Sequence, residues 1–248
     1  MENFPYPKGS TWRKWDLQTQ TILDDDYVPL SQYAEEIKKS NPIEWQQYIT
    51  KVGGEANAIL YDSKSYFNDN TINKNDRCLN YVRNLFAFIE TFNPDLECFG
   101  VTDHNYFDDC LLDKLIEYSQ KSQCKVIPGV EINCNGIHML LFFPEKLYQK
   151  QTYSAGIHAF LTKFDINNRK NADGALTTTT ADIKEILNEV KENGGIVIYP
   201  HCNSNNGLFQ ERNSVDRTNL ADIFNHQKIN LLQSQNHKSS QAVETYIK

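Results

Sequence analysis

The chain lacks long hydrophobic runs and an excess of positive charge. Its longest apolar segments have the length of a strand, far below the roughly 20 residues that span a bilayer, so we expect no membrane partner. It carries 25 Lys and Arg residues against 32 Asp and Glu residues, a formal net charge of −7. This balance provides no global basic field for a nucleic-acid backbone, although a local basic patch is compatible with it.

Several short motifs are also missing. The first residues show no basic segment followed by an apolar one, which would be typical of a secretory signal. The sequence has no Gly-x-x-x-x-Gly-Lys-Ser/Thr motif, so ATP hydrolysis is not expected from this chain. It has no Cys-x-x-Cys pair, and scattered cysteines favour free thiols in the reducing cytoplasm. The six cysteines are Cys78, Cys98, Cys110, Cys124, Cys134 and Cys202.

The apolar pattern predicts a single α/β domain over residues 1–248. With 40% hydrophobic residues, a chain of this length can bury one large core. Helical spacing and caps predict helices at 31–39, 45–49, 80–92, from Asp108–Asp109 onward, and at 183–190. Short apolar runs predict strands at 15–17, 98–102, 125–130, 137–143, 196–199 and 229–232. Strands that alternate with helices favour a parallel arrangement, in which polar groups collect at one rim.

Three further segments carry local predictions. Residues 27–95 resemble a partly helical insertion between the first strand and the main body. The polar stretch 145–180 is typical of a mobile loop of the kind that often covers a site. Thr179 and Asp182 fit a capping box for the following helix.

Histidines gather at the predicted strand ends. His104, His138, His201 and His237 stand at or just beyond strands, together with the carboxylates of Asp103 and Glu131. A lone histidine near a strand is more often structural, so the clustering carries the signal. Neutral imidazoles suit Zn, Mn or Fe, and a carboxylate can bridge two such ions for hydrolysis. The pattern therefore predicts a metal-binding rim.

The order of these motifs resembles the polymerase and histidinol phosphatase (PHP) superfamily over nearly the whole chain. The motifs are Thr102–His104, Pro128–Glu131, His138 after a turn, Pro200–His201 and Ser234–His237. The resemblance implies a distorted (βα)7 barrel that binds up to three metal ions and hydrolyses phosphoesters, including nucleotides or nucleic acids. The opening segment 9–17 is similar to the PHP modules of TrlF-type AAA- or SMC-like ATPases. That similarity implies an ATPase domain or subunit as partner and a role in anti-phage defence.

The chain departs from the family pattern at its two ends. The first motif, His-x-His, is replaced by Gln18-Thr19-Gln20, and the last, Asp-x-His, reads Gln235-Asn236-His237. The resemblance assigns all three altered positions to one metal site, which would lose its charge and two imidazoles. We therefore expect fewer than three divalent ions, of Mn, Zn or Fe.

The resemblance also distributes the remaining ligands. Glu131, His138 and His201 would hold a second ion, and His104, His237 and Asp26 a third. Glu131, His201 and Asp103 would be catalytic.

Each of these assignments has a structural alternative. Gln18 and Gln20 could simply donate hydrogen bonds at the rim, which we favour over ligation. Asp103 could orient His104 without touching a metal, and we favour that interpretation as well. Asp26 could belong to a solvated turn of three aspartates. Beside the ligand candidates, Cys134 and Cys202 are more typical of packing residues.

Three functions remain open at this stage. The first is a PHP-type phosphoesterase or nuclease with a reduced metal site. The second is a catalytically inactive PHP-like module that regulates a larger ATPase. The third is an amidohydrolase-like enzyme that acts on a non-phosphate substrate.

Overall fold

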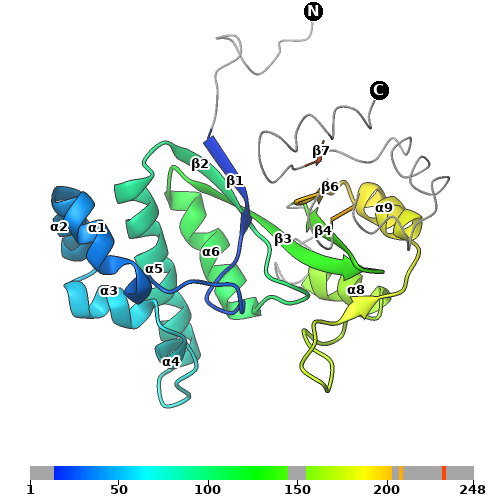
Figure 1. Ribbon diagram of the computed structural model, residues 1–248, viewed down its shortest axis with the longest axis horizontal. Coiled ribbons are helices and arrows are strands. Elements are labelled where there is room, and N and C mark those ends of the chain that lie inside the picture. The colour runs from blue at the N-terminus through cyan, green and yellow to red at the C-terminus, as the bar shows by residue number, and fades with distance from the viewer. Residues whose placement is uncertain (1–13, 145–154, 203–206, 209–230, 233–248) are drawn as a thin grey trace, which may run out of the picture.

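The protein is a mixed α/β structure in which one curled sheet lies between two groups of helices (Figure 1). The computed structural model describes residues 14–144, 155–202, 207–208 and 231–232. This confirms the α/β class. Among the described residues, no helix has the length and apolar character needed to cross a membrane.

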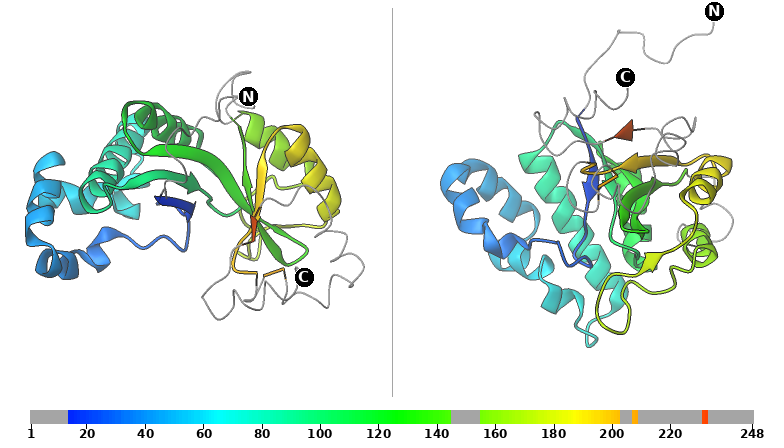
Figure 2. Two further views of the ribbon diagram at one scale, coloured as in Figure 1. Left: turned by 90° about the horizontal axis from the view of Figure 1, so that it is seen from above. Right: turned by 45° about the vertical axis from the view of Figure 1, so that its right-hand side comes forward.

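The sheet has the strand order β1-β2-β3-β4-β6-β7, and β5 pairs with β3 off this path. The strands are β1 (Lys14–Thr19), β2 (Leu96–Val101), β3 (Lys125–Cys134), β4 (Ile137–Phe142), β5 (Thr178–Thr179), β6 (Ile196–Tyr199) and β7 (Leu231–Leu232). Neighbours β1, β2 and β3 run parallel, whereas β4 runs antiparallel to both β3 and β6. Figure 2 shows how β3 passes through both halves of the curled sheet.

Strands β3 and β4 run antiparallel, although parallel strands were expected. A tight turn between them explains this direction. Asn135 and Gly136 both have positive φ, 51° and 88°, a conformation that asparagine and glycine tolerate. The side chain of Asn133 accepts a hydrogen bond from Gly136 N. These two residues between β3 and β4 leave no room for a crossover helix, so the chain returns beside itself.

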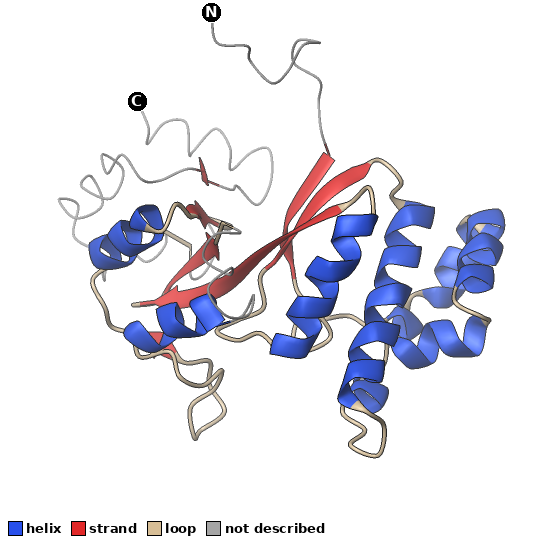
Figure 3. Ribbon diagram, turned by 180° about the vertical axis from the view of Figure 1, so that it is seen from behind, coloured by secondary structure: helices blue, strands red, loops and turns tan. Residues whose placement is uncertain are grey.

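Helices fill the segment between β1 and β2. They are η1 (Leu30–Gln32), α1 (Ala34–Ser40), α2 (Pro42–Lys51), α3 (Glu55–Tyr61), α4 (Lys64–Phe67) and α5 (Lys74–Phe92). Leu30, Trp45, Tyr48 and Ala58 bury their side chains together against α5. Figure 3 shows α5 and α6 (Asp109–Lys121) covering one face of the sheet, with the smaller helices stacked outside α5.

Two local predictions in the second half of the chain were wrong. The stretch 145–180 is not all loop, because it contains α8 (Ala155–Lys163), whose Ile157, Phe160 and Leu161 pack into the main core. The capping box is also incorrect. Asp182 is itself the N-cap of α9 (Ile183–Glu192) and accepts a hydrogen bond from Lys184 N.

Side chains alternate between the two faces of β3 and β4. Val130 and Ile132 of β3, with Met139 and Leu141 of β4, join the large core beneath α8 and α9. With the two-residue period of a strand, Glu131 and His138 point to the opposite, inner face. The inner face is therefore apolar at one end, where Leu140 and Phe142 pack, and polar at the other.

Phe142 fills the inner face over two glycines. A Cβ atom on Gly100 would lie 2.4 Å from the ring of Phe142, and one on Gly129 would lie 2.8 Å from it. Only glycine leaves space for the ring at these positions. The glycine in the Pro128–Glu131 motif is therefore a packing requirement of the curled sheet.

Candidate metal centre

Backbone hydrogen bonds hold two candidate ligands, His104 and Glu131, side by side. Beyond β2 the chain forms an isolated bridge between them. Glu131 N donates to Asp103 O over 3.1 Å, and Asn105 N donates to Glu131 O over 2.7 Å. Asn105 adopts a positive φ of 54° that asparagine tolerates, so the chain can turn directly after His104.

Three imidazoles converge on one oxygen of the buried Glu131. Its Oε1 lies 2.7 Å from His138 Nδ1, 3.5 Å from His104 Nε2 and 3.7 Å from His201 Nε2. His201 follows β6 with a positive φ of 34°, a strained conformation that tends to occur at functional sites. The structure thus brings together four predicted ligands from β3, β4 and the segments that follow β2 and β6.

Asp24 contacts His104 from the other side. Its Oδ2 accepts a hydrogen bond from His104 N over 2.7 Å and lies 3.1 Å from His104 Nδ1. The position that orients His104, which the sequence analysis gave to Asp103, is therefore occupied by Asp24. Asp24 is buried although it stands in a run of three aspartates. Nothing in the run distinguishes its first member, so sequence reasoning missed it.

Asp103 instead supports the loop after β1. Its two oxygens accept hydrogen bonds from Thr21 N over 2.5 Å and from Thr21 Oγ1 over 2.6 Å. Burial raises the pKa of Asp103 to about 7, against the lowering effect of both Thr21 hydrogen bonds. The carboxyl group thus joins the segments that follow β1 and β2.

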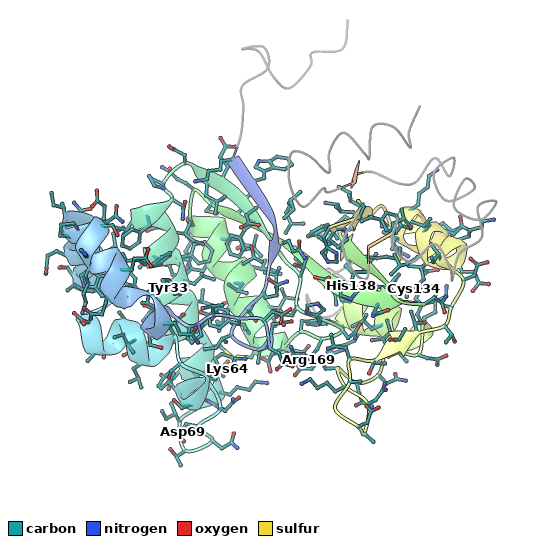
Figure 4. The ribbon with its side chains drawn as sticks, viewed as in Figure 1. Tyr33, Lys64, Asp69, Cys134, His138 and Arg169 are labelled. Atoms are coloured by element: carbon teal, nitrogen blue, oxygen red, sulfur yellow. The ribbon has the colours of Figure 1, made fainter. Side chains whose placement is uncertain are left out.

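Basic residues from the segment before β5 close this side of the centre. Arg169 Nη2 lies 3.2 Å from Asp24 Oδ1, and Lys170 Nζ lies 2.5 Å from Asp25 Oδ2. Arg169 also donates to Leu23 O. Figure 4 shows Arg169 and His138 near the middle of the molecule, between the two groups of helices.

Imidazoles and carboxylates shift one another's pKa values in this centre. Burial alone would lower the pKa of His104, but hydrogen bonds to Asp24 and Glu131 outweigh it and raise that pKa to about 10. Burial would raise the pKa of Glu131, but its three imidazole neighbours hold it well below the ordinary range. Burial likewise opposes the effect of His104 on Asp24, whose pKa falls to about 2. These carboxylates favour positive charge among them.

The remaining predicted site residues are distributed as follows. Gln18 of β1 donates a hydrogen bond from its side-chain amide to Glu131 Oε2 over 3.2 Å. Gln20 lies one residue past β1 and is partly buried. Asp26 is exposed, yet it offers an oxygen within 4.8 Å of ligand atoms of Asp24 and His104. Gln235 and His237 lie outside the described residues.

These side chains fit a divalent cation. Ligand atoms about 2.1 Å from one ion lie about 3.0–3.4 Å apart, close to the separations around Glu131 Oε1. Atoms of His104, Glu131 and His138 all lie within 4.8 Å of one another, as do those of Asp24, Asp26 and His104. Imidazole nitrogens with carboxylate oxygens are a donor set that suits Zn, Mn or Fe. The two groups share His104.

Comparisons with known proteins give a likeness in structure but no match in sequence. No protein-family model matches the chain, and no curated protein sequence matches it. Among solved structures, the chain is similar to a crystal structure of a candidate metal-dependent phosphoesterase from Bifidobacterium adolescentis. The TM-score is 0.44 with 12% sequence identity, over 94% of this chain and 82% of that chain.

Proposed function

We propose that this protein is a metal-dependent phosphoesterase of the PHP type whose metal site is reduced. The observation that supports this best is the convergence of His104, His138 and His201 on Oε1 of the buried Glu131. A carboxylate that shares one oxygen among several imidazoles can bridge two ions. The altered residue Gln18 lies on the other oxygen of the same carboxylate.

Each residue has a defined task in this proposal. Glu131, His138 and His201 would hold one ion, and His104 with Asp26 would hold a neighbouring one. A divalent ion, when bound, supplies the Lewis-acid chemistry that activates a water for attack on a phosphoryl group. Asp24 would keep the ring of His104 in the required orientation through Nδ1.

Arg169 would contribute to substrate binding. A guanidinium group suits a phosphoryl group because its donors match the geometry of phosphate oxygens. The side chain lies at the border of the centre and is largely buried. It would hold an anionic substrate near the ions and balance the charge of Asp24.

Metal-dependent turnover tests the proposal. Protein freed of metal with a chelator would be supplied with Mn²⁺, Zn²⁺ or Fe²⁺ and assayed on phosphomonoesters, phosphodiesters, nucleotides and single-stranded DNA. We expect hydrolysis that Glu131→Gln abolishes and that Glu117→Gln, an exposed change on α6, leaves intact. Circular dichroism would verify that both variants fold. Turnover that is unchanged in Glu131→Gln would refute the proposal.

The Gln18 hydrogen bond favours a second candidate, a catalytically inactive PHP-like module of a larger ATPase. In that case the amide takes the place of an ion at Glu131 Oε2. Elemental analysis separates the two candidates, because stoichiometric Mn, Zn or Fe that Glu131→Gln removes contradicts a metal-free module. The ATPase partner and the role in anti-phage defence belong to the proposal as well. Phage challenge of cells carrying the full gene, with and without Glu131→Gln, tests that role.

A further inference from the structure

A second group of metal-binding side chains lies away from Glu131, between two helices. Cys78 stands in the second turn of α5, Asp108 is the N-cap of α6, and Cys110 stands in the first turn of α6. One sulfur or oxygen atom from each lies within 4.8 Å of the other two. Cys78 and Asp108 are buried, and Cys110 is partly exposed, so a cation can reach the group from solvent.

We propose that Cys78, Asp108 and Cys110 bind a Zn²⁺ ion that fastens α5 to the start of α6. Zn²⁺ takes thiolate sulfurs at about 2.3 Å and carboxylate oxygens at about 2.0–2.2 Å in a tetrahedral arrangement. Such ligands lie about 3.5–3.8 Å apart, within the observed limit. Two thiolates and a carboxylate more than balance the charge of the ion, and soft sulfur ligands select Zn²⁺ over Mg²⁺ or Ca²⁺.

Asn75, in the first turn of α5, offers a fourth ligand. Its Oδ1 lies 3.3 Å from Cys110 Sγ. This carbonyl oxygen or a water molecule would complete the tetrahedron. The thiol of Cys110 currently donates to Asn75 Oδ1, so it would give its proton to solvent on binding the ion.

Lys74 competes for the carboxylate. Its Nζ lies 2.6 Å from Asp108 Oδ2, whereas Asp108 Oδ1 accepts the capping hydrogen bond from Leu111 N over 3.0 Å. The ion would therefore displace Lys74 from Oδ2 and leave the helix cap intact. Lys74 is half exposed and can move into solvent at little cost. Removing its charge is then expected to strengthen zinc binding.

The ion would bind both sulfurs as thiolates, so two protons leave the protein as the ion binds.

The ion would also hold the segment between β2 and α6 in place. Asp108 ends the segment that carries Asp103, His104 and Asn105 from β2 to α6. An ion held by Asp108 and Cys110 on one side and Cys78 on the other would fix the end of this segment to α5. Zinc binding is then expected to raise the melting temperature without any contribution from Glu131.

Cobalt spectroscopy can test the site independently of the proposed function. Co²⁺ bound to thiolates shows an intense ligand-to-metal charge-transfer band in the near ultraviolet, and His104, Glu131 and His138 contribute no sulfur. We expect the full-length protein to show this band with Co²⁺ and to lose it when Zn²⁺ is added. Glu131→Gln should keep the band, so failure of the Glu131 centre and failure of this site are distinguishable.

Four variants sharpen the test. Cys110→Ser, at a partly exposed position, should abolish the band, whereas Cys98→Ser, a buried thiol elsewhere, should keep it. Asp108→Asn preserves an N-cap acceptor and should weaken Zn²⁺ binding. Lys74→Met should tighten it by up to about fivefold, the equivalent of one exposed ion pair.

Several outcomes would overturn the proposal. They are the absence of the band, its persistence in Cys110→Ser, or its loss in Cys98→Ser. A disulfide between Cys78 and Cys110 in protein that has never bound metal, detected by mass spectrometry without reductant, would also count against it. Cys78→Ser is not needed for the decision, because this fully buried change could prevent folding.

Discussion

Gln18 donates a hydrogen bond to Oε2 of Glu131, and all three imidazole contacts of that carboxylate fall on Oε1. The two oxygens of one buried side chain thus have different environments, one neutral and one rich in imidazole nitrogen. A first ion in the PHP arrangement would have to take the place of the Gln18 amide. In the proposed arrangement, the hydrogen bond from Gln18 would stand where a metal contact is expected.

The first prediction concerns Gln18. Gln18→Ala removes the amide from Glu131 Oε2, and we expect unfolding free energy to fall by about 1 kcal/mol, the net value of one hydrogen bond. Metal affinity at the imidazole side should not fall, because the amide does not contact Oε1. Urea denaturation and calorimetric Mn²⁺ titration measure the two effects, with Gln20→Ala as the matched control. A loss of metal binding in Gln18→Ala would contradict this division.

The second prediction concerns Asp24 in metal-free protein. Its pKa of about 2 lies below the unfolded value near 4, so its stabilisation is present above pH 4 and is lost as the pH falls toward 2. We expect Asp24→Asn to cost about 2 kcal/mol at neutral pH and to remove this acid dependence. The pKa of His104, followed by NMR, should fall from about 10.

Asp25→Asn is the control for this experiment. Asp25 is half exposed and pairs with Lys170 at the surface, so its replacement should change stability by less than about 1 kcal/mol. Equal losses of stability in Asp24→Asn and Asp25→Asn would show that burial does not determine the contribution of Asp24.

The third prediction concerns Asp62, which lies in the helical region before β2. Burial raises its pKa to about 6, although Tyr27 and Leu30 N both donate hydrogen bonds to it. The folded protein therefore binds a proton that the unfolded chain releases near pH 4, and stability falls as the pH rises from about 4 to 6. The fall attributable to Asp62 is at most about 3 kcal/mol.

Asp62→Asn should remove this part of the pH dependence. Thermal melts between pH 4 and 7 compare the variant with the parent protein, and Asp69→Asn, a change in an exposed turn, serves as control. If the stability of the parent protein rises between pH 4 and 7 in parallel with that of Asp62→Asn, the prediction is wrong.

The fourth prediction concerns the contact of Phe142 with Gly100. Gly100→Ala places a methyl group against the ring and should destabilise the protein by about 1–3 kcal/mol. Phe142→Leu makes room, so the double variant should recover part of this loss. A double-mutant cycle measured by urea denaturation gives the coupling. Additive effects would show that another contact, such as Leu17 O at 3.2 Å, sets the cost.

Much of the fold follows from local pattern, and the exceptions have physical causes. The apolar runs predicted β2, β3, β4 and β6 because buried strands must be continuously hydrophobic. The helix α8 was not predicted, although its apolar residues recur at helical spacing. The polar segments on both sides of it led to the whole stretch 145–180 being assigned as a loop. The reversal at Asn135 and Gly136 was predicted as a turn, but its effect on strand direction was not considered.

The candidate site was likewise predicted only in part. His104, Glu131, His138 and His201 were predicted to lie together because strand ends gather at one rim, and the structure places all four together. Asp24 was not found, because its burial depends on contacts with His104 and Arg169 that are distant in sequence. The cluster of Cys78, Asp108 and Cys110 was missed for the same reason, since Cys78 lies on α5 and the other two stand at the start of α6, about 30 positions further along the chain.

The bridge between His104 and Glu131 has a consequence for how such a centre can change over time. It is made by main-chain groups of Asp103, Asn105 and Glu131, and no side-chain atom takes part in those hydrogen bonds. The frame can therefore persist while its ligands are exchanged one by one. A protein of this design can gain or lose an ion through a few substitutions without having to evolve a new fold.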